Sequence, residues 1–317
     1  MNVKILEKCN VSAASFLGEG GEAWVYAIDD TTVVKIYKNN DLSKDLAAYK
    51  LFYERCDFTA AALYPLKILD TGTIDNTLYS VELRVPGIDA GKALEQERQI
   101  KNRENMLIEF YNAAKKIALL ETNNPNEYSQ LFIENTPHSE SWEEYLDIMA
   151  GEKLDTMSPL YNSTDTLHQF SKRIKDLNYC AGPKLVHFDY FPTNTIAYDN
   201  KIHAVIDFSL AMYGDPLIDI AGAIGYLPLD NSATYEEYLL LLERMRLEYP
   251  QNIGTLTTYL IFMAIYWSGC DIECVKKWSD TILKTWQDNN CGSNDVVIWK
   301  SIAPPKPLCV YTIPSYG

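Results

Sequence analysis

The pattern of apolar and polar positions divides the chain into a strand-rich beginning and a helix-rich remainder. Short apolar or alternating runs bounded by Gly, Asp and Asn predict strands at 17–26, 32–37, 66–69 and 77–84, with a glycine turn inside the first run. One helical pattern, at 42–55, interrupts them. Val85-Pro86-Gly87 then breaks the pattern, so we place a domain boundary there, between residues 1–86 and 87–317.

Apolar residues in the second unit recur every three or four positions, as on the buried face of a helix. The longest such pattern runs from 92 to 121, and further helices are expected at 142–149, 167–177, 218–225, 235–247, 256–268 and 272–287. The final segment, 291–317, is rich in proline and is expected to be extended. These elements predict an α+β protein with a small β-rich lobe and a larger, mostly helical lobe.

A β-hairpin between these helices carries polar residues at one end. Its strands are expected at 194–198 and 202–208, because Asp199-Asn200-Lys201 suits a tight turn. Asn194 opens the first strand and Asp207 closes the second, so the hairpin brings the two side chains together. Asp189 lies in the loop that leads into this end. Carboxylate and amide oxygens suit Mg²⁺ that is bound jointly with substrate phosphates.

The spacing Asp189-x-x-x-x-Asn194 matches a kinase catalytic loop, in which the Asp orients the acceptor hydroxyl and the Asn holds metal. Asp207-Phe208 then stands where kinases have a second metal-binding Asp. The structural alternative is a hairpin whose Asp and Asn side chains only cap turns.

Three motifs carry a family resemblance: HFDYFPTN at 187–194, IDF at 206–208 and GDPLIDIA at 214–221. Together they resemble the aminoglycoside phosphotransferase and choline kinase family. The resemblance implies a protein-kinase-like fold and transfer of a phosphoryl group from ATP or GTP to a hydroxyl of a small molecule. It makes Asp189 the catalytic residue and gives Mg²⁺ to Asn194 and Asp207. The family usually has Gly where this chain has Phe188.

The first lobe supplies the candidate phosphate contacts. A turn with Gly18, Gly20 and Gly21 allows backbone N–H groups to approach phosphates, but the motif is weak by itself, and the alternative is a simple hairpin turn. Lys35 stands in the middle of a strongly β-prone strand, where kinases place the lysine that reaches the phosphates. Lys38, at the end of that strand, fits an edge lysine that points to water.

Kinases pair this lysine with a carboxylate on the following helix. Asp45 is favoured, because it shares a face with apolar residues, and Glu54 is the alternative. By resemblance only, the adenine edge is expected to contact the backbone between Glu82 and Arg84.

Two further residues near the loop are assigned structural roles. His187 could act as a base, but its place two residues before Asp189 favours a brace for the loop. Asp219 is likewise expected to brace the catalytic loop or to cap a helix.

Composition limits the other possibilities. The net charge of −15 argues against nucleic acid as a partner. Seven cysteines without a CxxC pair indicate a reducing compartment. The start lacks the apolar run of a signal peptide, and the longest apolar run is too short to cross a membrane. We therefore expect a cytoplasmic protein without membrane contact.

The acceptor is expected to be a small molecule with a cationic group, such as an amino sugar or a quaternary amine, because carboxylates and aromatic faces suit ammonium groups. The residues behind this expectation are Glu140, Glu143, Glu144, Asp147, Glu236, Glu237, Asp271 and Glu273, with Trp142, Trp267 and Trp278. The alternative is that these acidic residues only solvate the surface. Two other functions stay open: a protein Ser/Thr kinase of the same fold, and a nucleotide-binding regulator with little turnover.

Overall fold

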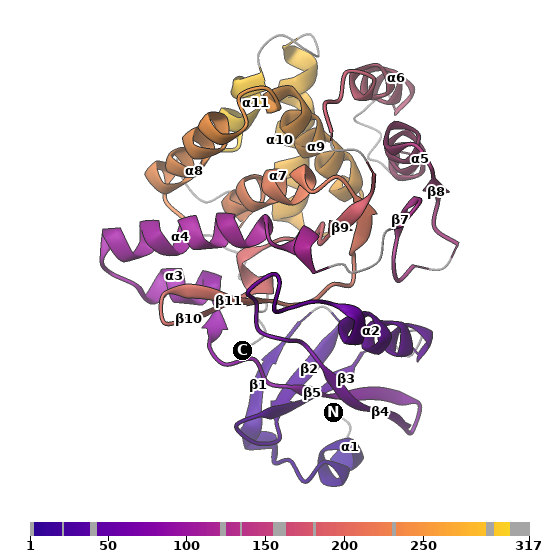
Figure 1. Ribbon diagram of the computed structural model, residues 1–317, viewed down its shortest axis with the longest axis vertical. Helices are drawn as coiled ribbons and strands as arrows, with labels where there is room; N and C mark the ends of the chain where they lie inside the picture. Colours follow the sequence, from indigo (N-terminus) through magenta and orange to yellow (C-terminus); the bar gives the residue numbers. More distant parts are fainter. Residues whose placement is uncertain are drawn as a thin grey trace.

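The computed structural model describes residues 3–20, 22–38, 43–120, 125–133, 135–154, 163–179, 182–229, 233–289 and 295–304. An antiparallel sheet region at the beginning of the chain is followed by a larger helical region. In Figure 1 the sheet forms the lower end of the molecule. The helix α2 lies beside the sheet, on the side that faces the helical region. The predicted α+β class, with a small β-rich region and a larger helical region, is confirmed.

The first sheet has five strands in the order β1-β2-β3-β5-β4, and all neighbours are antiparallel. The strands are β1 (Phe16–Glu19), β2 (Ala23–Ala27), β3 (Thr32–Tyr37), β4 (Ile68–Ile74) and β5 (Thr77–Leu83), with the helices α1 (Val3–Lys8) and α2 (Ser43–Arg55) beside them. The register sets Val33 opposite Glu82 and Lys35 opposite Ser80. Side chains two residues apart share a face of a strand, so Lys35 and Glu82 lie on the same face of the sheet.

The hairpin between β4 and β5 is tighter than the sequence pattern suggested. We expected a turn over residues 70–76, whereas β4 continues to Ile74 and only Asp75 and Asn76 form the turn. Both residues adopt positive φ angles, of 49° and 59°. Asn and Asp tolerate this conformation, and the two-residue turn matches the twist of the paired strands.

The break at 85–87 leads directly into a second sheet. Gly87 has a φ of 120°, and a Cβ atom there would lie 2.2 Å from the carbonyl oxygen of Ala197. Only glycine allows this close approach. The next two residues form β6 (Ile88–Asp89), which pairs with β10 (Thr195–Tyr198) of the predicted hairpin.

Two small sheets carry the hairpin and the strands on either side of the loop that contains Asp189. One has the order β11-β10-β6 and the other the order β8-β7-β12-β9. Their remaining strands are β7 (Tyr128–Gln130), β8 (His138–Ser139), β9 (Lys184–Val186), β10 (Thr195–Tyr198), β11 (Lys201–Val205) and β12 (Met212–Gly214). The predicted hairpin is confirmed, with Asp199 and Asn200 at positive φ in its turn.

The helices of the second region are α3 (Ala90–Gln96), α4 (Ile100–Ala114), α5 (Trp142–Leu154), α6 (Ser163–Ile174), α7 (Leu217–Gly225), α8 (Tyr235–Glu248), α9 (Ile253–Trp267), α10 (Glu273–Asp288) and α11 (Asp295–Ser301). Nearly all of α7 and α9 is buried, so these two helices form the centre of the core. The expectation of an extended segment from 291 onward is wrong for α11, whereas residues 305–317 lie outside the described part.

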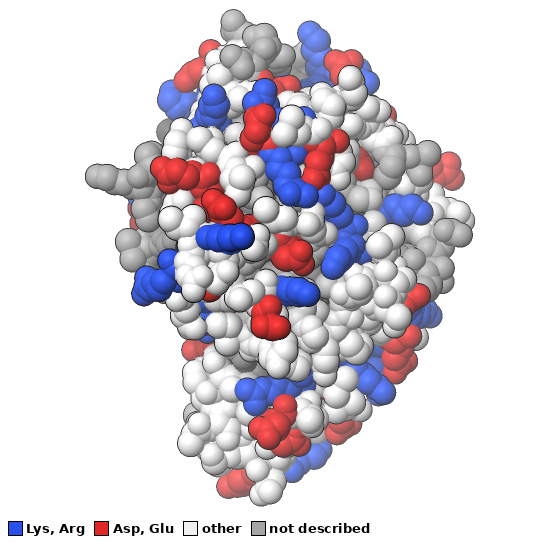
Figure 2. All heavy atoms as spheres, turned by 60° about the vertical axis from the view of Figure 1, so that its left-hand side comes forward, with Lys and Arg blue, Asp and Glu red and all other residues white. Residues whose placement is uncertain are grey.

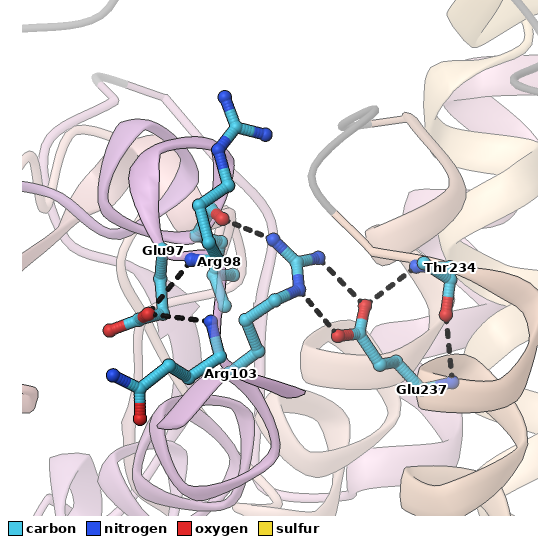
Figure 3. A network of polar contacts seen from close by, with 7 residues as sticks. Glu97, Arg98, Arg103, Thr234 and Glu237 are labelled. Carbon is cyan, nitrogen blue, oxygen red and sulfur yellow. Dashed lines mark hydrogen bonds and ion pairs between the residues drawn. The ribbon is translucent and has the colours of Figure 1, made fainter. Parts of the chain in front are cut away.

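The single long helix expected from 92 to 121 is in fact two helices. Glu97 adopts an extended conformation, and its carboxylate accepts hydrogen bonds from the N–H groups of Arg98 and Gln99, each at 2.8 Å. Figure 3 shows Arg103 extended from α4 toward α8, where two of its nitrogens contact the Glu237 carboxylate at 2.7 and 2.8 Å. The local bonds of Glu97 and the long-range contact of Arg103 accompany the break, which the continuous apolar pattern did not predict.

The surface carries charges of both signs. On the face shown in Figure 2, Lys and Arg side chains are interspersed with Asp and Glu. Among the described residues, no helix is long and apolar enough to cross a membrane.

Candidate functional site

The β10–β11 hairpin and the loop before it bring Asp189, Asn194 and Asp207 to one end. The Asn194 amide nitrogen donates to the Asp189 backbone carbonyl at 2.9 Å and to its carboxylate at 3.1 Å. The Ile206 N–H donates to the Asn194 carbonyl at 2.9 Å, which holds the end of the hairpin beside the loop. Asp207 follows directly and has a φ of 61°.

Asp219, at the start of α7, braces the loop that contains Asp189, as expected. Its two carboxylate oxygens accept the backbone N–H groups of His187 at 2.8 Å and Phe188 at 2.9 Å. Phe188 has a φ of 68°, in the left-handed region that glycine occupies at least cost. The structure thus gives a reason for the glycine that the family usually has at this position.

His187 is also a brace. The ring is fully buried, and its Nε2 bonds the Ile206 carbonyl at 2.8 Å. Burial lowers the pKa of His187, because a charged imidazolium would lose its solvation. A ring that bonds the hairpin backbone in this way supports the loop rather than the reaction.

The pKa of the Asp189 carboxyl differs from that of an ordinary surface carboxylate. Its pKa is raised to about 7, mainly by burial and also by the charges of Asp207 and Glu22, while the Asn194 hydrogen bond opposes the rise. A carboxyl with a pKa near neutrality can take up a proton during a reaction.

Lys35 extends toward the hairpin from the centre of the first sheet. Its ammonium lies 3.3 Å from the Glu82 carboxylate, which also accepts a 2.6 Å hydrogen bond from the Ser80 hydroxyl. The sequence had placed the partner of Lys35 on α2. Of the two candidates there, Glu54 is exposed, and the side chain of Asp45 lies outside the described part.

Glu82 therefore has a side-chain contact with Lys35, in addition to the backbone role that resemblance suggested. Glu82 pairs with Val33, two residues before Lys35, so the two side chains are diagonal neighbours across β3 and β5. The prediction considered only carboxylates on the following helix and therefore missed this contact. Only an acidic residue in a β-prone run hinted at it.

Two adjoining cavities meet at Lys35, Glu82 and Asp207. One lies toward α2 and is lined by these residues together with Glu22, Ala23, Tyr37, Leu46, Tyr49, Tyr53 and Ile68. The other opens toward 83–85 and is largely apolar, with Val25, Val33, Leu66, Ile196 and Ile206 in its lining. A polar end and an apolar end suit the phosphates and the base of a nucleotide, respectively.

The predicted hinge borders the apolar cavity. Leu83, Arg84 and Val85 line it. The N–H groups of Leu83 and Arg84 already donate to the carbonyls of Lys67 and Thr31, at 2.9 and 2.8 Å. These two amides are therefore engaged within the protein.

The glycine turn lies between β1 and β2. Gly18 belongs to β1, and Gly20 donates its N–H to the Ala23 carbonyl at 2.9 Å, whereas Gly21 lies outside the described residues. The next residues, Glu22 and Ala23, line the cavity that contains Lys35 and Asp207. The turn thus reaches the polar end of the cavity.

Lys38 departs from its expected role. Its ammonium donates to the Gly20 carbonyl at 2.7 Å and pairs with Glu19 at 2.5 Å. It was expected to point to water as an edge lysine, and instead it contacts the turn.

The donor set at the hairpin fits Mg²⁺. Because the Asn194 nitrogen is engaged with Asp189, its oxygen is the free end of the amide. One amide oxygen and the Asp207 carboxylate are hard donors. Among the described residues, no group of three His, Cys, Asp or Glu side chains could hold a metal ion. An ion held by Asn194 and Asp207 would need further ligands, such as substrate phosphates or water.

Much of the acidic and aromatic set expected around an acceptor is engaged elsewhere. Glu237 is paired with Arg103, and Glu273 with Lys277. Trp142 and Trp278 are fully buried in the core. Trp267 differs, because its N–H donates to the Tyr226 hydroxyl at 2.9 Å, and that hydroxyl donates to the Phe188 carbonyl in the catalytic loop at 3.3 Å.

The family model described as "Phosphotransferase enzyme family" matches residues 14–246, which include the glycine turn, Lys35 and the whole β10–β11 hairpin. The chain belongs to this family. No curated protein is a significant sequence match.

Solved structures of aminoglycoside phosphotransferases share the fold of this family member. A thermostable mutant of APH(4)-Ia without ligand is 17% identical, with a TM-score of 0.64, and the match covers 95% of this chain and 97% of that one. Its ternary complex with AMP-PNP and hygromycin B is 18% identical, with a TM-score of 0.64, and covers 96% and 99%. The GDP and kanamycin complex of APH(2")-IIia is 14% identical, with a TM-score of 0.56, and covers 91% and 98%. These likenesses establish the kinase-like fold.

Proposed function

We propose that this phosphotransferase-family protein transfers the γ-phosphoryl group of ATP to a hydroxyl of a small molecule. The observation that carries the proposal is the meeting of Lys35 and Asp207 at one cavity, with Asp189 and Asn194 at the neighbouring end of the hairpin. Phosphoryl transfer needs mainly positioning and charge neutralisation, and this arrangement supplies both.

Each residue has a defined role in this proposal. Asp189 orients the acceptor hydroxyl and takes its proton. Lys35 contacts the phosphates, and the turn with Gly18, Gly20 and Gly21 covers them. Asn194 and Asp207 would hold Mg²⁺, which neutralises phosphate charge when it is bound.

The remaining contacts concern the base and the division of the chain. The apolar cavity beside 83–85 takes the adenine. Backbone contacts between Glu82 and Arg84 would then use carbonyl groups, because the N–H groups of Leu83 and Arg84 are engaged within the protein. The hinge at 85–87 divides a nucleotide-binding lobe, residues 1–86, from an acceptor-binding lobe, residues 87–317. The complexes of the solved relatives, one with AMP-PNP and one with GDP, support a nucleotide in this cleft.

The acceptor in this proposal is a cationic small molecule. The net charge of −15 favours capture of cations. Aromatic rings surround the catalytic loop, where Tyr226 stacks on Phe191 with centroids 4.2 Å apart. The Tyr266 ring beside Phe188 lies 4.3 Å from the Lys153 ammonium, so a ring of this cluster already contacts a cation.

The test is a comparison of Asp189→Asn with the unchanged protein. We expect kcat to fall about 10²- to 10⁴-fold, the usual contribution of a positioned base. Because Asp189 faces the acceptor, the affinity for ATP should change little. ATP consumption would be measured with pools of amines, amino sugars and neutral hydroxyl compounds, and ATP affinity by titration. Unchanged turnover would remove Asp189 from the mechanism, and no ATP consumption with any pool would count against the proposed activity.

A further inference from the structure

Lys38 makes three contacts around the glycine turn. Its ammonium donates to the Gly20 carbonyl at 2.7 Å, pairs with the Glu19 carboxylate at 2.5 Å and lies 5.2 Å from the centre of the Trp24 ring. The side chain is 28% exposed, so it packs along the turn rather than extending into water. One cation thus contacts both strands that flank the turn.

The backbone of Lys38 contacts the same turn. Its N–H donates to the Glu22 carbonyl at 2.8 Å. Within the turn, the Gly20 N–H donates to the Ala23 carbonyl at 2.9 Å. The turn is therefore closed by its own hydrogen bond and is tied to Lys38 at two carbonyls, those of Gly20 and Glu22. Only the first of these two ties depends on the lysine side chain.

The position of the turn makes this contact relevant to the nucleotide. Glu22 and Ala23, at its end, line the same cavity as Lys35 and Asp207. A glycine turn has an unusually large conformational freedom, and binding a ligand to a mobile turn costs the entropy of ordering it. A contact that orders the turn in advance removes part of that cost.

We infer that Lys38 is a positioning residue for the nucleotide: its bond to the Gly20 carbonyl holds the glycine turn over the phosphate end of the cavity. This inference rests on the proposed function, because it takes the cavity to be the phosphate site. Lys38 itself does not touch the phosphates in this arrangement. It acts through the turn, whereas Lys35 contacts them directly.

The ammonium also neutralises an acidic side chain on the turn. The hydrogen bond from Lys38 lowers the pKa of Glu19, so this residue is ionised beside a site for polyanions. Loss of Lys38 could therefore weaken binding in two ways, through a loose turn or through an unpaired negative charge. The experiment must separate them.

The test uses Lys38→Met, which removes the ammonium and keeps the backbone N–H and much of the stem. We expect the Kd for ATP with Mg²⁺ to rise about tenfold, equivalent to about 1.4 kcal/mol. At saturating ATP, kcat should stay within about twofold, since no group that reacts has been changed. Hydrogen exchange in the nucleotide-free protein should be faster for peptides that span residues 18–25. Lys38→Arg should restore most of the affinity, because its guanidinium can also donate to the Gly20 carbonyl.

Two controls make the outcome specific. Lys4→Met removes another ammonium of the same lobe, which pairs with Asp75 at 2.7 Å on the β4–β5 turn, and should leave the Kd unchanged. The double variant Glu19→Gln with Lys38→Met removes the unpaired charge and should still bind ATP weakly. If the double variant regains full affinity, Lys38 acts by neutralising charge and the positioning inference is wrong.

The remaining outcomes are equally decisive. An unchanged Kd or unchanged exchange in Lys38→Met, with normal binding in the parent protein, overturns this inference and leaves the proposed function intact. A parent protein that fails to bind ATP overturns both.

Discussion

Phe188 offers a sharp test of how this catalytic loop is built. Its backbone lies in the left-handed region, with a φ of 68°, where glycine is favoured. Its side chain, however, is only 1% exposed, and the ring packs against α9. The ring is edge-on to Tyr266, with ring centroids 4.7 Å apart, and lies beside Phe262, with ring centroids 5.8 Å apart. Backbone strain favours Phe188→Gly, and the packing of the ring opposes it.

The magnitudes decide which effect is larger. Truncation of a buried Phe to Ala costs about 3–5 kcal/mol. In the left-handed region, a glycine variant is about 1 kcal/mol more stable than an alanine variant. This difference already includes the cost of the larger entropy of glycine in the unfolded chain. Phe188→Gly should therefore lower the free energy of unfolding by about 2–4 kcal/mol. Phe188→Ala should be about 1 kcal/mol less stable than the Gly variant.

Urea denaturation followed by tryptophan fluorescence measures these differences. Phe170 is the matched control, because it is fully buried against Phe262 but lies within the helix α6. At a helical position the order should reverse, with Phe170→Gly about 1 kcal/mol less stable than Phe170→Ala. The same order at both positions would refute the left-handed backbone at Phe188. A Phe188→Gly variant more stable than the parent would show that strain exceeds packing.

Four further results are expected at the site. Asp207→Asn should weaken ATP binding in the presence of Mg²⁺ more than in its absence, because a neutral amide is a poorer ligand for a hard cation. Thermal shift measures ATP binding under both conditions, and an equal loss of affinity in the two would place the metal elsewhere. The kcat/KM should rise with pH through about 7, because Asp189 must be ionised to take the proton and its pKa is raised to about 7. Glu22→Gln should move that rise to lower pH, since the charge of Glu22 helps to raise the pKa of Asp189, and an unmoved profile would exclude this contribution. Salt shortens the Debye length from about 10 Å at 0.1 M to about 3 Å at 1 M. Over this range the kcat/KM for a cationic acceptor should fall more than the kcat/KM for a neutral analogue. An equal fall for the two acceptors would reject the cationic acceptor.

Local patterns in the sequence were sufficient for much of the architecture. The alternating strands, the Asp199-Asn200 turn and the positions of α7 to α10 follow from contacts between residues close in the chain. The meeting of Asn194 and Asp207 follows from the geometry of one hairpin, and Asn194 lies within hydrogen-bond distance of Asp189 as expected. The roles of these residues in catalysis stay predictions.

Other features depend on residues that are far apart in the chain. The break between α3 and α4 accompanies the contact of Arg103 with Glu237, and a continuous apolar pattern could not predict it. The apolar pattern records only which face of a helix is buried. It carries no information on a charged partner that arrives from another helix.

The contacts of two lysines show the same division most clearly. The sequence identified Lys35 as a strand lysine that needs a partner, but the register between β3 and β5 brought Glu82 to it. Lys38, at the strand end, lies against the glycine turn because β2 pairs with β3 and returns the turn to that end. The sequence pattern thus determined the secondary structure of most segments, because that structure depends on residues close in the chain. Strand pairing decided which side chains meet. A register joins residues that are far apart in the chain, and their separation leaves no local signal.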